Sequence, residues 1–131
     1  MRARIANMSA FKVSEAAQLL GVSDDTVRRW ADSGRLTLSG TPATIDGVEL
    51  AALAQELGTE AGASTSSARN RFTGIVTRVT KDGVMAQVEL QAGPFRVVSL
   101  ISREAADELG LEPGVLAVAS VKATNVGIEL A

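Results

Sequence analysis

Apolar residues in the first half of the chain recur at helical spacing. A first helix is predicted near residues 14–20 and ends at Gly21, because glycine readily adopts the left-handed conformation found at helix ends. A second helix follows Ser23, a favoured N-cap residue, and turns Val27 and Trp30 inward. A third helix has an apolar face made of Leu50, Leu53 and Leu57. Three short helices are therefore expected to bury one another around the tryptophan.

The second half of the chain changes to the alternating pattern of strands. Residues 84–90 alternate after a turn at residues 81–83, which is typical of a hairpin. We expect three strands, a short helix capped by Ser102, and two last strands near Val115–Val121 and Val126–Leu130. The first connections are too short for parallel crossovers, so a small closed or partly closed barrel of the oligonucleotide-binding type is predicted.

The stretch that begins at Gly58 has the composition of a flexible connector, rich in Gly, Ala, Ser and Thr and without a large apolar residue. We therefore predict a first domain over residues 1–57, a linker over 58–66 and a second domain over 67–131. Small domains of this kind are marginally stable alone, and burial between subunits is an expected source of stability.

The composition excludes several classes of function. The chain has 131 residues with no cysteine and no histidine, which removes disulfides, thiolate and imidazole metal sites and the usual catalytic base. No apolar run approaches a membrane span and the N-terminus lacks a signal-peptide core, so a cytoplasmic protein without membrane contact is expected. The 13 basic and 15 acidic residues nearly balance, so DNA binding would require a local basic patch.

Three segments of the first domain form a motif: VSEAAQLLGVS at 13–23, TVRRW at 26–30 and SGRL at 33–36. They resemble the winged helix-turn-helix of MerR-type regulators and phage excisionases, over roughly residues 11–57. In that family the second helix enters the major groove and the wing contacts the backbone. The resemblance implies four DNA-binding residues, which are Thr26, Arg28, Arg29 and Arg35.

The expected wing, Thr37–Thr44, departs from this family because it has no Lys or Arg. Few phosphate contacts would make DNA binding weak. Arg28 and Arg29 can instead belong to an ordinary solvated helix face on a protein-docking module. Both interpretations stay open at this point.

The second domain carries an ordered series of motifs, which are SARN at 67–70, GIV at 74–76, SLIS at 99–102, ELGLEPG at 108–114 and KAT at 122–124. Together they resemble the molbindin or Mop domain of the wider TOBE class, over residues 66–131. The expected fold class is thus α+β, a small winged helix-turn-helix followed by an OB-like β-barrel. The family binds molybdate or tungstate between subunits, which implies an oxyanion site of Ser67, Ala68, Arg69, Asn70, Ser99, Ser102, Lys122, Ala123 and Thr124.

This set of residues suits a tetrahedral dianion. Such an anion offers only acceptors, and hydroxyls, backbone N–H groups, one Arg and one Lys are all donors. Ser99 interrupts an apolar strand face between Val97 and Ile101, as a hydroxyl facing a site would. Taken singly, Ser102 can be only a helix cap, Lys122 a solvated strand end and Arg69 a surface ion-pair partner.

Three classes of function follow from these motifs. The first is a molybdate- or tungstate-responsive transcriptional regulator that couples anion occupancy at a subunit interface to DNA binding. The second is an intracellular store of the oxyanion. In both cases a homo-oligomer is expected, which is a dimer, or a hexamer built as a trimer of dimers. A DNA-architectural protein with a purely structural barrel is a further alternative, and an enzyme is not expected because no catalytic constellation is present.

Overall fold

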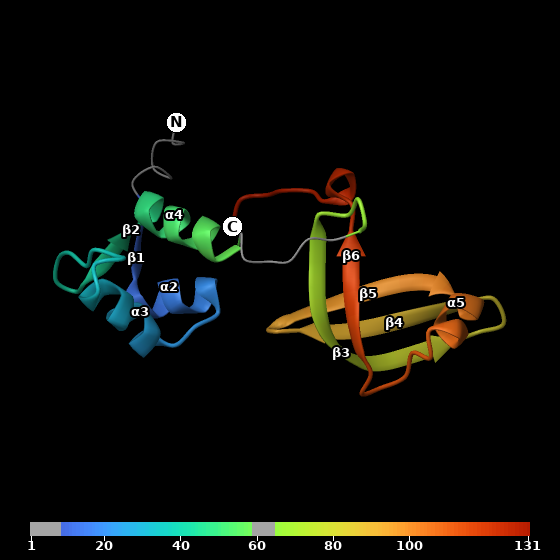
Figure 1. Cartoon of the computed structure of the whole chain (residues 1–131). Coiled ribbons are helices and arrows are strands. Elements are labelled where there is room, and N and C mark those ends of the chain that lie inside the picture. The colour runs from blue at the N-terminus through green and yellow to red at the C-terminus, as the bar shows by residue number, and fades with distance from the viewer. Residues whose placement is uncertain (1–8, 59–64) are drawn as a thin grey trace. The chain divides into compact units, whose positions relative to one another are not determined.

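The computed structural model describes residues 9–58 and 65–131, and the chain forms two compact units, residues 1–63 and 64–131 (Figure 1). The first unit is mainly helical and the second is a curled antiparallel sheet with one short helix, so the predicted α+β class is confirmed. No helix in the described part of the chain is long and apolar enough to cross a membrane.

The first unit places three helices around a two-stranded sheet. Strand β1 (Ala10–Lys12) pairs antiparallel with β2 (Thr44–Asp46), and the helices are α2 (Val13–Leu20), α3 (Asp24–Asp32) and α4 (Gly47–Gly58). The buried core combines residues of these elements and of the segment after α3: Val13, Ala16, Ala17, Val27, Leu36, Ile45, Leu50 and Leu53.

Local signals set the turn between α2 and α3. Gly21 ends α2 with a φ of 70°, the left-handed conformation that glycine tolerates. Ser23 caps α3, since its hydroxyl accepts a hydrogen bond of 3.1 Å from the backbone N–H of Thr26. Trp30 was expected at the centre of the core, but it is only partly buried and packs at the edge, because Val27 and Ile45 fill the centre.

The second unit is a four-stranded sheet in the order β5-β4-β3-β6, with every neighbouring pair antiparallel. Its elements are β3 (Asn70–Lys81), β4 (Met85–Ala92), β5 (Phe95–Ser102), α5 (Arg103–Glu108) and β6 (Leu116–Val121). The predicted hairpin and the short helix after Ser102 are thus confirmed. Strands β5 and β6 form the two edges of the sheet.

Strand β3 belongs to two ladders and bends between them (Figure 1). Its first half, Asn70–Ile75, pairs with β6, whereas Ile75–Lys81 pairs with β4, with an irregularity between Val76 and Arg78. At the bend, a Cβ on Gly74 would lie 2.3 Å from the carbonyl oxygen of Gln91, so only glycine allows this approach. The resulting curl gives the sheet a concave face.

The predicted last strand, Val126–Leu130, is wrong for the single chain. After β6 a short 3-10 turn, η1 (Ala123–Asn125), leads into an irregular segment in which the side chains of Ile128 and Leu130 are 92% and 94% exposed. The alternating pattern is present, but a strand requires a partner edge, and this segment pairs with none of the described strands. The barrel therefore stays half open.

We expect Gly74→Ala to lower the free energy of unfolding of the second unit by about 2 kcal/mol or more, because the added methyl must displace the backbone of β4. Circular dichroism during urea unfolding measures the loss. Fluorescence of Trp30, the only tryptophan, reports on the first unit and should not change. Gly83→Ala is the control, since nothing lies within 4 Å of its Cβ position; equal stabilities of the two variants would contradict the role of Gly74.

Candidate functional site

The SARN and KAT motifs lie side by side at one end of the β3–β6 ladder. Asn70 is the register partner of Val121, and the side-chain amide of Asn70 donates a hydrogen bond of 3.1 Å to the carbonyl oxygen of Val121. Arg69 and Lys122 are the next residues outward from this pair. The antiparallel register thus brings two cations from distant parts of the sequence to one place.

The turn before β3 is held by its own residues. The backbone N–H of Ala68 donates to the Ser66 hydroxyl at 3.1 Å, and the Arg69 guanidinium donates to the carbonyl oxygens of Ser67 at 3.2 Å and Ser66 at 3.5 Å. These contacts use one guanidinium nitrogen, so the other donors of Arg69 stay available to an anion. The guanidinium also covers two carbonyl oxygens that would otherwise repel a negative ligand.

The KAT motif forms the 3-10 turn η1 after β6. Lys122 is its N-cap residue, and its carbonyl oxygen accepts from the backbone N–H of Asn125 at 2.9 Å. Ala123 and Thr124 are exposed, and the first N–H groups of such a turn have no acceptor within it. Over residues 9–58 and 65–131, no carboxylate lies within ion-pair distance of Lys122 or Arg69.

Ser99 lies on β5, at the opposite edge of the sheet from β6, and lines a groove on the concave side. The strands β5 and β6 line the two sides of a groove of about 370 Å³, and its lining includes Ser99, Val97 and Ile101 on β5 and Val121 on β6. The break in apolar alternation at Ser99 therefore places a hydroxyl in the groove. The rest of the lining is mostly apolar.

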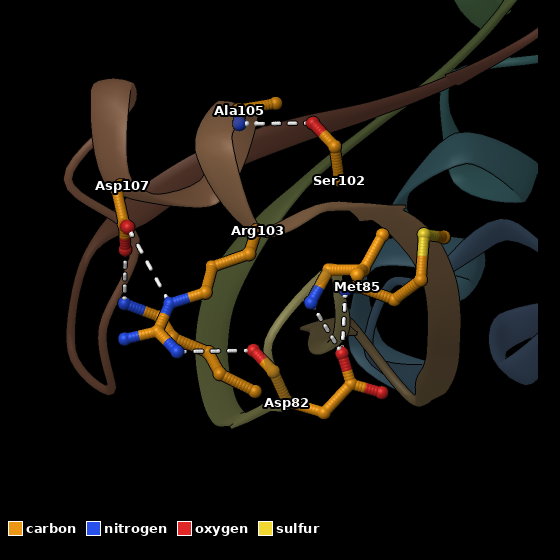
Figure 2. Close-up of polar contacts among 8 residues, drawn as sticks. Asp82, Met85, Ser102, Arg103, Ala105 and Asp107 are labelled. Atoms are coloured by element: carbon orange, nitrogen blue, oxygen red, sulfur yellow. Dashed lines mark hydrogen bonds and ion pairs between the residues drawn. The ribbon is translucent and has the colours of Figure 1, made fainter.

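Ser102 is the N-cap of α5, and its hydroxyl accepts a hydrogen bond of 3.0 Å from the backbone N–H of Ala105 (Figure 2). The helix-cap role considered from the sequence is therefore present. The hydroxyl hydrogen is not used by this contact, so Ser102 can still donate to a ligand.

A polar cluster fixes α5 against the β3–β4 hairpin (Figure 2). The Arg103 guanidinium donates to the carbonyl oxygen of Asp82 at 3.0 Å, and Lys81 forms a short ion pair with Asp107. Hydrogen bonds from the backbone N–H groups of Met85 and Val84 lower the pKa of Asp82, and the hydrogen bond from Lys81 lowers the pKa of Asp107. Ser102 is thus attached to a corner of the sheet that several polar contacts hold together.

The predicted oxyanion residues consequently form two groups in one chain. The SARN and KAT residues lie at the β3–β6 end, whereas Ser99 and Ser102 lie on β5, and β4 separates β5 from β3 in the sheet. Ser66 was not among the residues predicted from the sequence. Its position two residues before Ala68 is the spacing at which a serine hydroxyl accepts from a backbone N–H, and this local signal could have identified it.

The predicted DNA-binding residues of the first unit differ in their contacts. Arg29 donates a hydrogen bond of 2.9 Å to the Thr26 hydroxyl, whereas Arg28 is exposed and has no ion-pair partner in the described part of the chain. Arg35 lies over the Trp30 ring, 5.6 Å from its centroid, and 3.8 Å from a carboxylate oxygen of Glu56. Arg35 therefore links the end of α3 to α4.

The loop at the wing position is neutral. Ser39 and Thr44 form an isolated antiparallel bridge, and the backbone N–H of Thr37 donates to the carboxylate of Glu49 on α4. The loop is therefore anchored to the helical core, but it has no basic side chain for a phosphate. Among the described residues of this unit, two basic side chains, Arg28 and Arg29, lie on α3.

Comparison with known families agrees with the division of the chain into two units. The model of the TOBE domain matches residues 66–128, and the model of a helix-turn-helix domain matches residues 10–57. Molybdenum-pterin-binding proteins 2 and 1 of Clostridium pasteurianum are 41% and 38% identical to this chain over 63 residues, which are 47% of this chain and 93% of each relative. The protein is thus a helix-turn-helix unit joined to a TOBE unit.

Solved structures similar to this chain include a molybdate-binding protein from Sporomusa ovata, at 28% identity and a TM-score of 0.49, covering 51% of this chain and all of that one. MopII from Clostridium pasteurianum has 39% identity and a TM-score of 0.47, covering 50% of this chain and all of that one. On the sequence relatives and the matched model, the chain belongs to the TOBE-domain family that includes the molybdenum-pterin-binding proteins.

Proposed function

We propose that this protein binds molybdate or tungstate through its TOBE unit, binds DNA through its helix-turn-helix unit, and regulates transcription by coupling the two. The observation that carries the anion part is the adjacency of Arg69 and Lys122, each without a carboxylate partner among the described residues. The names of its relatives, molybdenum-pterin-binding proteins, support the choice of oxyanion.

The chemistry of the site supports an anion that carries no proton. Every group assigned to it can donate: the guanidinium of Arg69, the ammonium of Lys122, serine hydroxyls and the first N–H groups of η1. Molybdate and tungstate are dianions with four acceptor oxygens and have no proton that needs an acceptor. Charge-assisted hydrogen bonds to such an ion are roughly twice as strong as neutral ones.

A second copy of the chain completes the site in this proposal. The groove between β5 and β6 is open, and the side chains of Val126, Ile128 and Leu130 are exposed on a segment with strand alternation. Exposed apolar residues in this number favour burial against another copy, and homo-oligomers usually have closed symmetry. The SARN and KAT residues of one copy can then face β5 of another.

An oxyanion store is the second candidate, and the charge of α3 favours it. This helix has three aspartates and two arginines, and the neutral loop at the wing position adds no cation. A surface of this kind attracts the DNA backbone weakly. In a store, the helical unit would contact another protein instead of DNA.

We expect Arg69→Ala and Lys122→Ala each to weaken molybdate binding by about 2 kcal/mol, because each removes a charge-assisted hydrogen bond. Titration calorimetry with molybdate, tungstate and sulfate measures the effect, with sulfate expected to bind weakly. Arg78→Ala removes a cation from the other half of β3, opposite Glu89, and should leave affinity unchanged. Unchanged affinity in both site variants would show that the site lies elsewhere.

The full chain is expected to be at least a dimer at micromolar concentration with molybdate present. Ile128→Asp combined with Leu130→Asp should shift it toward monomer and weaken the anion, because the exposed apolar segment becomes charged. Glu129→Gln, on the intervening position, is the matched control. Light scattering that finds a monomeric full-length protein with anion bound would contradict the shared site.

Regulation predicts a reciprocal coupling between anion and DNA. When molybdate is added, the binding free energy of the protein for a duplex selected from a random library should change by roughly 1–3 kcal/mol. By linkage, the duplex should change the binding free energy of molybdate by the same amount. Fluorescence anisotropy and calorimetry measure the two sides. Tight molybdate binding without any selected duplex, in either condition, would exclude the regulator and leave the store.

A further inference from the structure

At the start of α3, the side chains of Ser23, Thr26 and Arg29 contact one another. The hydroxyls of Ser23 and Thr26 lie 3.0 Å apart, and one terminal nitrogen of Arg29 donates to the Thr26 hydroxyl at 2.9 Å. Ser23 also accepts from the backbone N–H of Thr26 at 3.1 Å, which is its capping role. The Arg29 guanidinium is therefore held toward the N-terminal end of the helix.

The neighbouring Arg28 has no such restraint. It is exposed, and no hydrogen bond or ion pair of its side chain occurs over the described ranges. Both arginines border one shallow hollow on the exposed face of α3, together with Ser23, Asp25 and Asp32. The two adjacent arginines thus differ in restraint: Thr26 holds the side chain of Arg29, whereas no side-chain contact of the described residues holds Arg28.

We propose that Thr26 is a positioning residue for DNA recognition, which holds Arg29 in place to contact a base edge while Arg28 contacts the phosphate backbone. The inference rests on the proposed DNA-binding function. It also changes the role of Thr26, which acts through Arg29 instead of touching DNA. One N–H of the terminal nitrogen Nη2 donates to Thr26, and the second N–H of Nη2 can still join a neighbouring guanidinium nitrogen in a two-point contact with guanine.

The fixed side chain suits specificity and the free one suits general affinity. A guanidinium that is already oriented loses less rotamer freedom when it meets a base, and it matches only one placement of acceptors. A mobile arginine adapts to any phosphate, so its contribution is independent of sequence and falls with salt. Asp25 and Asp32 beside the hollow repel phosphate. The contact of Arg29 with a base therefore supplies a larger share of the binding free energy.

The test uses the full chain and two duplexes. The first is selected by the wild-type protein from a random library, and the second is a scrambled duplex of the same composition. Thr26→Val removes the hydroxyl at nearly constant volume and keeps the backbone N–H that Ser23 caps. Thr26→Val should lower the affinity of the protein for the selected duplex about fivefold, the usual effect of one hydrogen bond. Its affinity for the scrambled duplex should stay unchanged.

Two further variants separate positioning from a structural effect. Thr26→Ser retains the hydroxyl and should restore affinity for the selected duplex. Arg28→Ala should weaken both duplexes alike and lower the dependence of affinity on salt. Thermal melting checks that α3 is intact in each variant.

The outcomes distinguish the inference from the proposed function. A selected duplex that Thr26→Val binds as tightly as wild type would overturn the positioning role alone. So would an equal loss on both duplexes, or a failure of Thr26→Ser to recover affinity. If no duplex is selected by the wild-type protein, DNA binding itself is overturned and the positioning role with it.

Discussion

Gly74 packs so closely against the backbone of Gln91 that no side chain fits between the two strands. This contact lets β3 change partners along its length, from β6 to β4, and so curls a four-stranded sheet that would otherwise be flatter. The curl forms the groove between β5 and β6. The antiparallel register of β3 and β6 sets the end of β6 beside the start of β3, where Arg69 and Lys122 lie.

The charges of the second unit are distributed in a way that fits an anion site. Two of its carboxylates form ion pairs away from that site: Lys81 holds Asp107, and Arg96 holds Glu89 at 2.9 Å and lowers the pKa of Glu89. These pairs are exposed and contribute little to stability individually. At the β3–β6 end, no carboxylate of the described residues lies within ion-pair distance of Arg69 or Lys122.

Short-range patterns predicted what depends on short-range interactions. Ser23, Gly21 and Ser102 mark their helix ends through contacts within a few residues, and alternation located the hairpin. The Val126–Leu130 strand could not be placed, because pairing depends on an edge that the single chain does not offer. Trp30 and Arg35 were assigned by spacing and motif, whereas a long-range contact with Glu56 decides where Arg35 lies.

The weak attraction of α3 for phosphate matters for the proposed regulation. A coupling of about 1–3 kcal/mol changes a dissociation constant by roughly 5- to 150-fold. Such a change alters DNA occupancy only when the protein concentration lies between the two dissociation constants. Three aspartates beside two arginines, and a loop without cations, limit general attraction to phosphate. In the proposed regulator, an interface of this kind would leave affinity dependent on the oriented Arg29 contact, and a modest anion signal would then determine whether the protein stays on its DNA site.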